Sequence, residues 1–223
     1  MPKKRAPTVE VAKRRNNRVL WLDHVELLDE DVEWLASTER LTLWNVKVPR
    51  DLLARLDKLW WLDIRGGSAT DLELANGVTK LQYLAVNQVR GMCDLSVVSE
   101  MTSLRYLNLY GLAKVTQLPS FRLLAKLEHA RLGQMRGLLS LHGLLEAPRL
   151  RELYLIRKIN VSADDVDGII KHPTIKKFNW FAEDVPNKSW VPVVEKIGLP
   201  EGPWGHPEEW FGLAESSVVP NGQ

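Results

Sequence analysis

Cysteine is nearly absent from this chain of 223 residues, and long apolar runs are absent altogether. The one cysteine, Cys93, excludes an internal disulfide and any cysteine-based metal cluster, which favours a reducing, cytoplasmic compartment. No window approaches the roughly 18 consecutive apolar residues of a transmembrane helix, so we expect no membrane span. The first residues, MPKKRAPTVEVAKRRNNR, lack the apolar stretch of a secretory signal, so we expect no signal peptide.

Recognisable catalytic motifs are also absent. The five histidines fall in no H-E-x-x-H frame and in no other close metal spacing. Gly66 and Gly67 lack the further glycines and the lysine of a phosphate-binding loop. The run DDVD at 164–167 is better explained as the acidic first turn of a helix than as a metal cluster. We therefore expect no enzyme, no cofactor and no metal site.

Charge is distributed unevenly along the chain. Residues 1–18 carry seven Lys or Arg and one acid, whereas residues 19–223 carry 23 bases against 27 acids, a balance of −4. We therefore expect a basic, flexible tail at 1–18 on a mildly acidic body. A nucleic-acid-associated factor that uses this tail is an alternative function, although nucleic-acid-binding domains normally carry a basic face on the body as well. The other interpretation of the tail is a disordered, solubilising arm.

A pattern of paired apolar residues recurs along most of the chain. The stretch LRYLNLYGL has leucine at 104, 107, 109 and 112, and its central pair is two residues apart. Side chains two apart in a strand point to the same side, so each pair predicts a short strand that faces the core. The pair occurs eight times at steps of 21 to 25 residues: Leu20 and Leu22, Leu41 and Leu43, Leu62 and Ile64, Leu84 and Val86, Leu107 and Leu109, Ala130 and Leu132, Leu153 and Leu155, Phe178 and Trp180.

This pattern resembles the leucine-rich repeat family, and its short period is most similar to the bacterial, internalin-like class. The resemblance covers about residues 17–181. It implies an α/β solenoid, a right-handed horseshoe with a parallel sheet of about eight strands on the concave face and short helices or 3-10 turns on the convex face. The asparagine position of the family consensus is apolar here, which leaves the loop geometry after each strand open. It holds Val25, Val46, Val89, Leu112 and Met135.

The expected organisation has four parts: a basic tail at 1–18, repeats at 19–181, a C-terminal cap at 182–200 and a tail rich in Pro, Gly and Trp at 201–223. Within the cap, Ser189 is a candidate helix N-cap and Gly198 a candidate C-cap. The stretch LPEGPWGHPEEWFGL has two interpretations. It is an irregular segment that folds back on the body through Trp204, Trp210 and Phe211, or a mobile peptide for a partner.

Aromatic and charged side chains fill the strand positions that face away from the core. An exposed face of Tyr, Trp, Arg and Asn has the composition of a protein-binding hot spot. The alternative is that aromatic residues favour strands and shield the sheet without a partner. The candidate partner-binding residues are Trp21, Trp44, Trp61, Asp63, Arg65, Tyr83, Asn87, Tyr106, Asn108, Tyr110, His129, Arg131, Glu152 and Tyr154.

These observations give a functional hypothesis. We expect a cytoplasmic, non-catalytic protein-protein interaction module, a monomer by itself, that binds another protein on its concave face. It would act by occlusion or scaffolding, and an inhibitor or immunity-type protein against a bacterial toxin is one such role. That role rests on fold analogy, and a fold does not determine a function.

Overall fold

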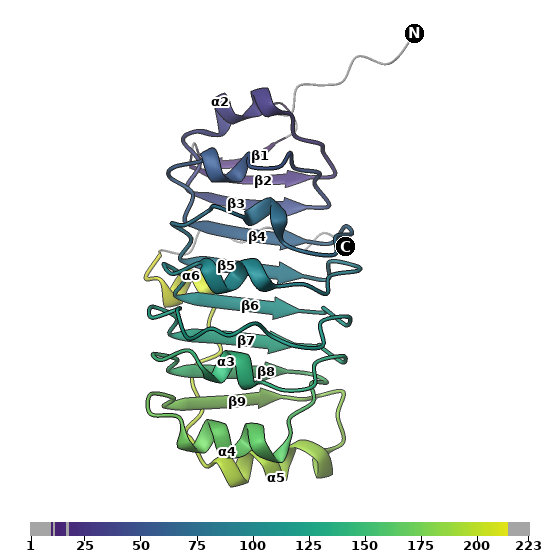
Figure 1. Cartoon of the computed structure of the whole chain (residues 1–223), viewed down its shortest axis with the longest axis vertical. Helices are drawn as coiled ribbons and strands as arrows, with labels where there is room; N and C mark the ends of the chain where they lie inside the picture. Colours follow the sequence, from purple (N-terminus) through teal and green to yellow (C-terminus); the bar gives the residue numbers. More distant parts are fainter. Residues whose placement is uncertain (1–9, 11, 17, 214–223) are drawn as a thin grey trace.

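The computed structural model describes residues 10, 12–16 and 18–213. They form one nine-stranded sheet in which the strand order follows the sequence (Figure 1). The strands are β1 (Lys13–Asn16), β2 (Val19–Asp23), β3 (Arg40–Trp44), β4 (Trp61–Arg65), β5 (Tyr83–Asn87), β6 (Tyr106–Tyr110), β7 (His129–Gly133), β8 (Glu152–Ile156) and β9 (Lys177–Phe181). The strands stack along the long axis of the molecule, so the chain is an open solenoid.

The apolar pairs set the register of the stack. From β2 to β9 the strands are parallel and pair position by position, so that Leu84 lies between Leu62 and Leu107. Leu107 and Leu109 are fully buried, because the second and fourth residues of each strand point into the core. The eight parallel strands and the repeat architecture predicted from the sequence are therefore confirmed.

The first strand differs from the others. β1 pairs antiparallel with β2 and has an irregularity between Arg14 and Asn16. It lies within the segment predicted to be a flexible tail, so that prediction is wrong for Lys13–Asn16, whose backbone hydrogen bonds extend the edge of the sheet. Residues 1–9, which carry Lys3, Lys4 and Arg5, lie outside the described residues.

Short helices on the convex side return the chain from one strand to the next. The α-helices there are α2 (Val32–Leu35), α3 (His142–Leu145) and α4 (Ala163–Lys171), and the 3-10 helices are η1 (Asp29–Asp31), η2 (Leu53–Arg55), η3 (Glu73–Ala75) and η4 (Ser96–Glu100). The stretch PRDLLARLDKL has the apolar spacing of a helix, with Leu52, Leu53, Leu56 and Leu59, but forms only the short helix η2. The helix predicted from the acidic run at 164–167 is confirmed as α4, and Ser162 and Asp165 form a capping box by exchanging side-chain to backbone hydrogen bonds.

A residue with left-handed backbone conformation directly follows each parallel strand from β2 to β8. These residues are His24, Asn45, Gly66, Gln88, Gly111, Gln134 and Arg157. Each donates its backbone N–H to the last residue of the next strand, as Gln88 does to the carbonyl of Tyr110 at 2.8 Å. These hydrogen bonds continue the ladder between the strands by one residue, so the backbone itself joins neighbouring repeats at the start of each loop.

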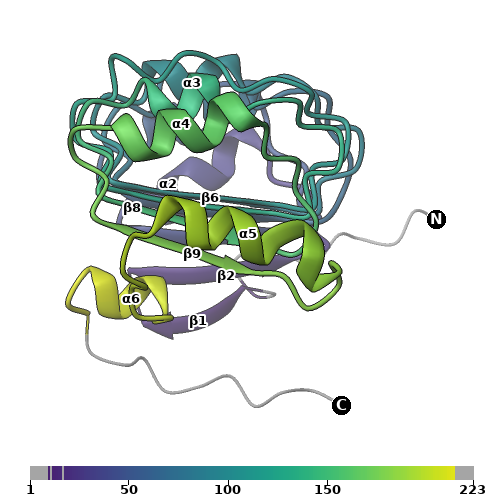
Figure 2. The same ribbon diagram turned by 90° about the horizontal axis from the view of Figure 1, so that it is seen from below.

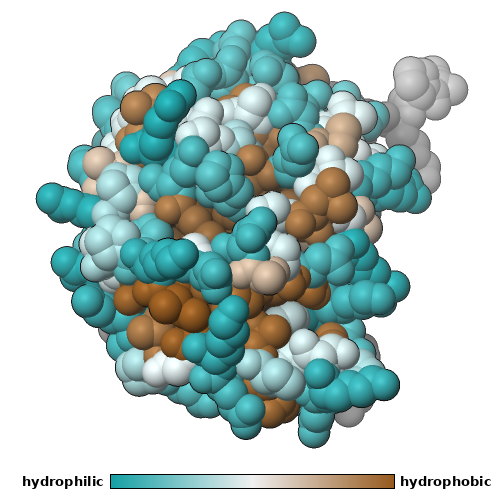
Figure 3. All heavy atoms as spheres, turned by 60° about the horizontal axis from the view of Figure 1, so that its bottom comes forward, coloured by the Kyte–Doolittle hydropathy of each residue, from teal (hydrophilic) through white to brown (hydrophobic). Residues whose placement is uncertain are grey.

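The C-terminal end of the stack is covered by α5 (Asn187–Ile197), which packs against α4 and β9. Trp190, Val193 and Val194 lie against the core, and Ile197 is buried. Gly198 is the left-handed C-cap, as predicted, but Ser189 lies inside the helix and Pro186 precedes it as N-cap. Figure 3 brings this end forward and shows apolar side chains gathered between polar ones around it.

Candidate functional site

The candidate site is the concave face of the sheet, formed by the first, third and fifth residues of each strand. These positions point away from the core, and across the strands they form three rows that we call the first, third and fifth columns. Figure 2 looks along the stack and shows α3 and α4 on one side of the sheet and α6 (Pro207–Trp210) on the other. The concave face is therefore not empty, because the C-terminal part of the chain returns across it.

Residues 200–213, which we call the strap, follow α5 and run along the concave face from β9 toward β4. The strap begins where the backbone N–H of Phe178 donates to the carbonyl of Pro200 at 3.1 Å. The side chain of Asn179 then forms two hydrogen bonds with the backbone of Gly202. Its amide nitrogen donates to the Gly202 carbonyl at 3.0 Å, and its oxygen accepts from the Gly202 N–H at 2.9 Å. A Cβ atom at Gly202 would overlap the Tyr154 hydroxyl, so only glycine seats the strap at this point.

The first column provides an aromatic floor beneath the strap. The rings of Trp61 and Tyr83 stack with centroids 3.7 Å apart, and those of Tyr106 and His129 stack at 4.1 Å. The strap's Trp210 meets Tyr106 edge-on at 5.6 Å. The strap and the floor form a second apolar cluster, separate from the main core, of Trp61, Tyr83, Ala85 and Tyr106 with Trp60, Trp210, Phe211 and Leu213 packed against it.

This covering corrects the expectation of an exposed aromatic face. Tyr106 is 1% exposed, Tyr83 3% and Tyr154 0%, and Trp61, Asp63 and His129 are buried with them. The aromatic side chains of the strap and those of the floor cover one another. This contact removes apolar surface of both from water, which favours the folded-back position of the strap. Of the two interpretations of the C-terminal tail, the structure shows the segment folded back, with Trp204, Trp210 and Phe211 as its contacts.

Three arginines of the sheet contact the strap. Arg40 forms an ion pair with Glu208 at 3.0 Å. Arg105, one residue before β6, lies over the ring of Trp210 at 5.1 Å from its centroid. Arg131 donates to the backbone carbonyl of Gly205 at 3.3 Å. Cations over aromatic faces and beside carboxylates are attractive contacts, so the arginines help to hold the acidic, aromatic strap in position.

A half-buried carboxylate, that of Glu152, organises the far end of the face. The side chain of Glu152 accepts from Tyr154 at 3.0 Å and from Lys177 at 2.9 Å, and its other contact is His129 Nδ1 at 3.1 Å. The hydrogen bond from His129 and those from Lys177 and Tyr154 lower the pKa of Glu152 to about 2, against the opposing effect of burial. Burial lowers the pKa of His129, although the carboxylate beside it acts in the opposite direction. We therefore assign a neutral imidazole that donates from Nδ1.

Asp63 and Arg65 form a second charged pair on β4. Arg65 donates to the Asp63 carboxylate at 2.6 Å and 2.9 Å. Burial raises the pKa of Asp63, and the hydrogen bond from Arg65 only partly offsets this. Burial also raises the pKa of Tyr83 well above its usual range, and that of Tyr106 to about 12. The phenols are therefore neutral at physiological pH.

Some polar atoms of the floor are left without partners. Among the described residues, the Tyr106 hydroxyl, His129 Nε2 and Arg131 Nε are buried and form no hydrogen bond. A buried polar atom that loses its hydrogen bonds to water without replacement destabilises the arrangement. The strap therefore matches the apolar shape of the floor more closely than it matches its hydrogen-bonding groups.

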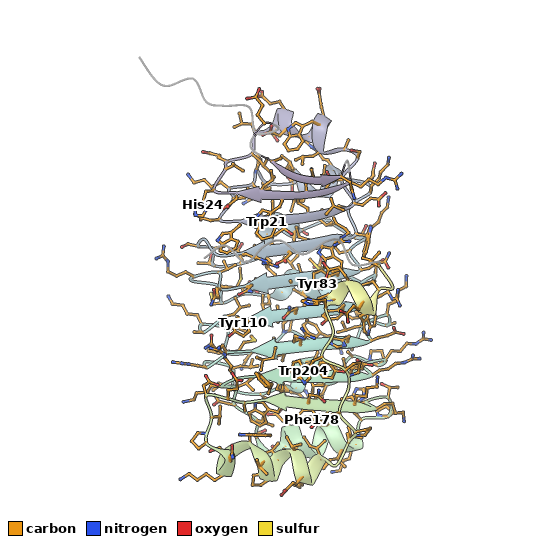
Figure 4. The ribbon with its side chains drawn as sticks, turned by 180° about the vertical axis from the view of Figure 1, so that it is seen from behind. Trp21, His24, Tyr83, Tyr110, Phe178 and Trp204 are labelled. Carbon is orange, nitrogen blue, oxygen red and sulfur yellow. The ribbon has the colours of Figure 1, made fainter. Side chains whose placement is uncertain are left out.

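On β3 to β6 the fifth column stays outside the strap (Figure 4), whereas on β9 its Phe181 lies against Trp204 of the strap. Trp44 is 41% exposed, and Arg65, Asn87 and Tyr110 are half-buried. Trp44 stacks on Trp21 with centroids 5.9 Å apart, and the Arg65 guanidinium lies over the Trp21 ring at 5.3 Å. We call these five residues the open ridge. A cavity of about 180 Å³ lies between its N-terminal part and the strap residues 206–208.

The predicted residues thus divide into two groups. Trp21, Trp44, Arg65, Asn87 and Tyr110 form the open ridge, whereas the other nine lie beneath the strap or beside it. Sequence reasoning missed Arg40 and Arg105, and it placed the strap's aromatic residues without locating the floor that receives them. Charge was one sequence signal for the contact between the strap and the sheet. Residues 200–213 carry three carboxylates and no Lys or Arg, whereas the outward-facing strand positions include arginines.

Other kinds of site receive no support in this part of the chain. Among residues 10, 12–16 and 18–213, no three His, Cys, Asp or Glu side chains gather into a group that could hold a metal ion. Over the same residues, no helix has the length and apolar character needed to cross a membrane. The sole cysteine, Cys93, is exposed and unpaired.

Comparisons with known proteins add little. No family model and no curated protein matches the chain. Among solved structures, it is similar to a crystal structure of an internalin (inlF) from Listeria monocytogenes str. 4b F2365, at 16% identity and a TM-score of 0.41. The match covers 68% of this chain and 50% of that chain, so the chain spans about half the length of the internalin. Similarity at this level identifies no function. The assignment of a leucine-rich-repeat-like fold rests on the strand order and register of the chain itself.

Proposed function

We propose that the chain is a non-catalytic protein-interaction module that contacts a partner protein through the open ridge on its concave face. The observation that carries this proposal is the accessibility of large aromatic and arginine side chains along the fifth column, beside a cavity of about 180 Å³. Tryptophan, tyrosine and arginine dominate binding energy at protein interfaces, because they bury large areas and lose little side-chain freedom.

The ridge is also held rigid before any partner arrives. Trp44 is stacked on Trp21, and Arg65 is fixed by two hydrogen bonds to Asp63. A side chain that is already ordered loses less entropy on binding, so a partner gains more from each contact. The strands beneath are five residues long and in register, which gives a flat, stiff support for these side chains.

The finer parts of this proposal concern the role. Binding across a rigid face suits occlusion or scaffolding, as in an inhibitor or an immunity-type protein directed at a bacterial toxin. Because the repeats are short, we also propose that they are of the bacterial, internalin-like class. A reducing, cytoplasmic setting suits the exposed thiol of Cys93.

A site-directed crosslink tests the proposal. A photoreactive phenylalanine analogue at position 44 should crosslink one partner protein in the native cells, whereas the same analogue at Leu123, 64% exposed on a return segment, should not. With that partner purified, Trp44→Ala and Arg65→Ala should each weaken binding by roughly 2 kcal/mol in calorimetry, and Leu123→Ala should leave it unchanged. Equal binding by the ridge variants and the wild type would refute the assignment.

A further inference from the structure

We propose that the strap occupies a docking groove for a peptide segment of the partner, and that the partner binds by displacing it. The segment has the strap's own chemistry, with acidic residues followed by two adjoining large aromatic side chains. This inference rests on the proposed function and adds to it the chemistry of the partner. The first-column floor and the arginines around it form the groove.

The aromatic floor fits the two adjoining rings closely. Phe211 contacts Trp60 at 5.3 Å and Trp61 at 5.7 Å between ring centroids, while Trp210 contacts Tyr106 at 5.6 Å. The floor rings stack along the column, so their faces and edges form a continuous apolar strip across four strands. Adjacent aromatic residues on an incoming segment would meet the same strip.

The charge of the groove selects an acidic segment. Arg40 binds Glu208, and Arg105 lies over both Trp210 and Phe211, at 5.1 Å and 5.6 Å from their centroids. The Arg40 side chain also lies over Trp61, 4.7 Å from the ring centroid, which holds its guanidinium at the entrance of the groove. A basic segment would bring like charges together here, so the groove discriminates against it.

The attachment of the strap is of a kind that permits exchange. Beyond Gly202 it pairs with no strand, and its polar contacts to the sheet come from arginine side chains, Arg131 to Gly205 and Arg40 to Glu208. Trp204 remains 45% exposed although it lies against Tyr154. Local elements with few backbone hydrogen bonds and partly exposed side chains open at the lowest free energy in a fold.

The polar atoms beneath the strap give a competitor its advantage. The Tyr106 hydroxyl and Arg131 Nε are donors, and neither has a hydrogen-bond partner among the described residues. A partner segment with a carboxylate that reaches them would satisfy both while it keeps the aromatic contacts. Such an advantage is needed, because the strap is covalently tethered and acts at a high effective concentration.

The test uses the full-length chain and a synthetic peptide of residues 200–213 as the probe. Gly202→Ala should unseat the strap and leave its side chains intact, because the added Cβ would overlap the Tyr154 hydroxyl. We expect the Gly202→Ala chain to bind the labelled peptide at least about tenfold more tightly than the wild-type chain does, because its groove is open in a larger fraction of molecules. A second variant, Trp210→Ala with Phe211→Ala, should behave in the same way.

The controls define the outcomes that overturn the inference. A peptide in which both Trp210 and Phe211 are replaced by Ala should not bind, and binding by it would show that the floor is not the site. Failure of both folded variants to bind the probe would make the strap a fixed structural element, as would failure of both variants to fold. A dimer of the wild-type chain that light scattering detects, with straps exchanged, would make the occupant a second copy and not a partner.

The outcomes also separate this inference from the proposed function. Peptide binding requires no partner, so it tests the groove alone. If the partner is insensitive to Trp44→Ala, the open ridge fails as the binding surface whatever the peptide does. If the partner depends on Trp44 but the peptide does not compete with it, the ridge stands and the displacement of the strap is refuted.

Discussion

The first and fifth columns of the concave face are built on the same strands, yet they have opposite surroundings. Tyr106 begins β6 and is 1% exposed, whereas Trp44 ends β3 and is 41% exposed. Both columns are rich in aromatic side chains, so composition does not distinguish them. The difference comes from the strap, which runs along the side of the sheet where the strands begin and leaves the other side open.

The comparison teaches that an aromatic row on a repeat sheet can serve as core or as binding surface. On the first column the rings contact the strap's aromatic residues and form a second, smaller core. On the fifth column Trp44 stacks on Trp21 of the third column and is otherwise open to solvent. The same residue types therefore contribute to stability in one column and remain accessible in the other, where we propose that they contact a partner, and the variants below separate the two roles.

The largest expected effect on stability is at the first column, which the strap covers. Tyr106→Ala should lower the free energy of unfolding by about 3 kcal/mol, because it removes a fully buried ring between the sheet and the strap. Denaturant titration measures it, and Leu107→Ala, which removes a side chain from the main core, provides the reference at about 2–5 kcal/mol. A loss below 1 kcal/mol at Tyr106 would mean that the strap adds no core.

The next effect is at the strap itself. Trp210→Ala should cost about 2 kcal/mol of stability, since its ring is half-buried against Tyr106 and His129. Trp204→Ala should cost less, because that ring is 45% exposed. Fluorescence of an apolar dye should rise for Trp210→Ala as the floor opens. The reverse order of the two variants would place the main anchor of the strap at its beginning.

Acid should lower the stability of the fold through Glu152 of the first column. Its folded pKa of about 2 lies below the ordinary 4.5, so the folded state favours the carboxylate. The stability it contributes is present above pH 4.5 and is lost as the pH falls from there toward 2. The pKa of His129, lowered from 6.5 by burial, acts in the same direction, because protonation below 6.5 favours the unfolded chain.

Thermal melts at several pH values measure this contribution. The wild type should melt above Glu152→Gln near neutral pH, and the gap should narrow as the pH falls from 4.5 toward 2. Tyr154→Phe removes one donor to the carboxylate. The difference in melting temperature between the wild type and Tyr154→Phe should therefore be smaller, and it should narrow over the same pH range. A gap that is constant with pH would show that the hydrogen bonds at Glu152 do not favour its charged form.

The smallest expected effect on stability is at the open ridge. Trp44→Ala should change the free energy of unfolding by no more than about 0.5 kcal/mol, because the side chain is 41% exposed and its loss leaves a gap that is open to solvent. The same titration as for Tyr106→Ala measures the change. A cost comparable to that of Tyr106→Ala would remove the contrast between the columns and make Trp44 a structural residue.

The sequence by itself determined the repeat. Every predicted apolar pair occupies the second and fourth positions of a parallel strand, because residues two apart in a strand share a face and a stack of identical units keeps one register. The capping box at Ser162 and the left-handed Gly198 were also readable, since both depend on residues a few positions apart. Local spacing and periodicity carry that information.

Only the tertiary structure decided which part of the concave face is open. The contact of Arg40 with Glu208 joins residues 168 positions apart, and no local pattern specifies such a pairing. The tail composition indicated aromatic anchors but not the column they cover. The choice is made by long-range fit: the acidic, aromatic strap lies against rings and arginines that the stacked strands bring together, and the open ridge is left to solvent.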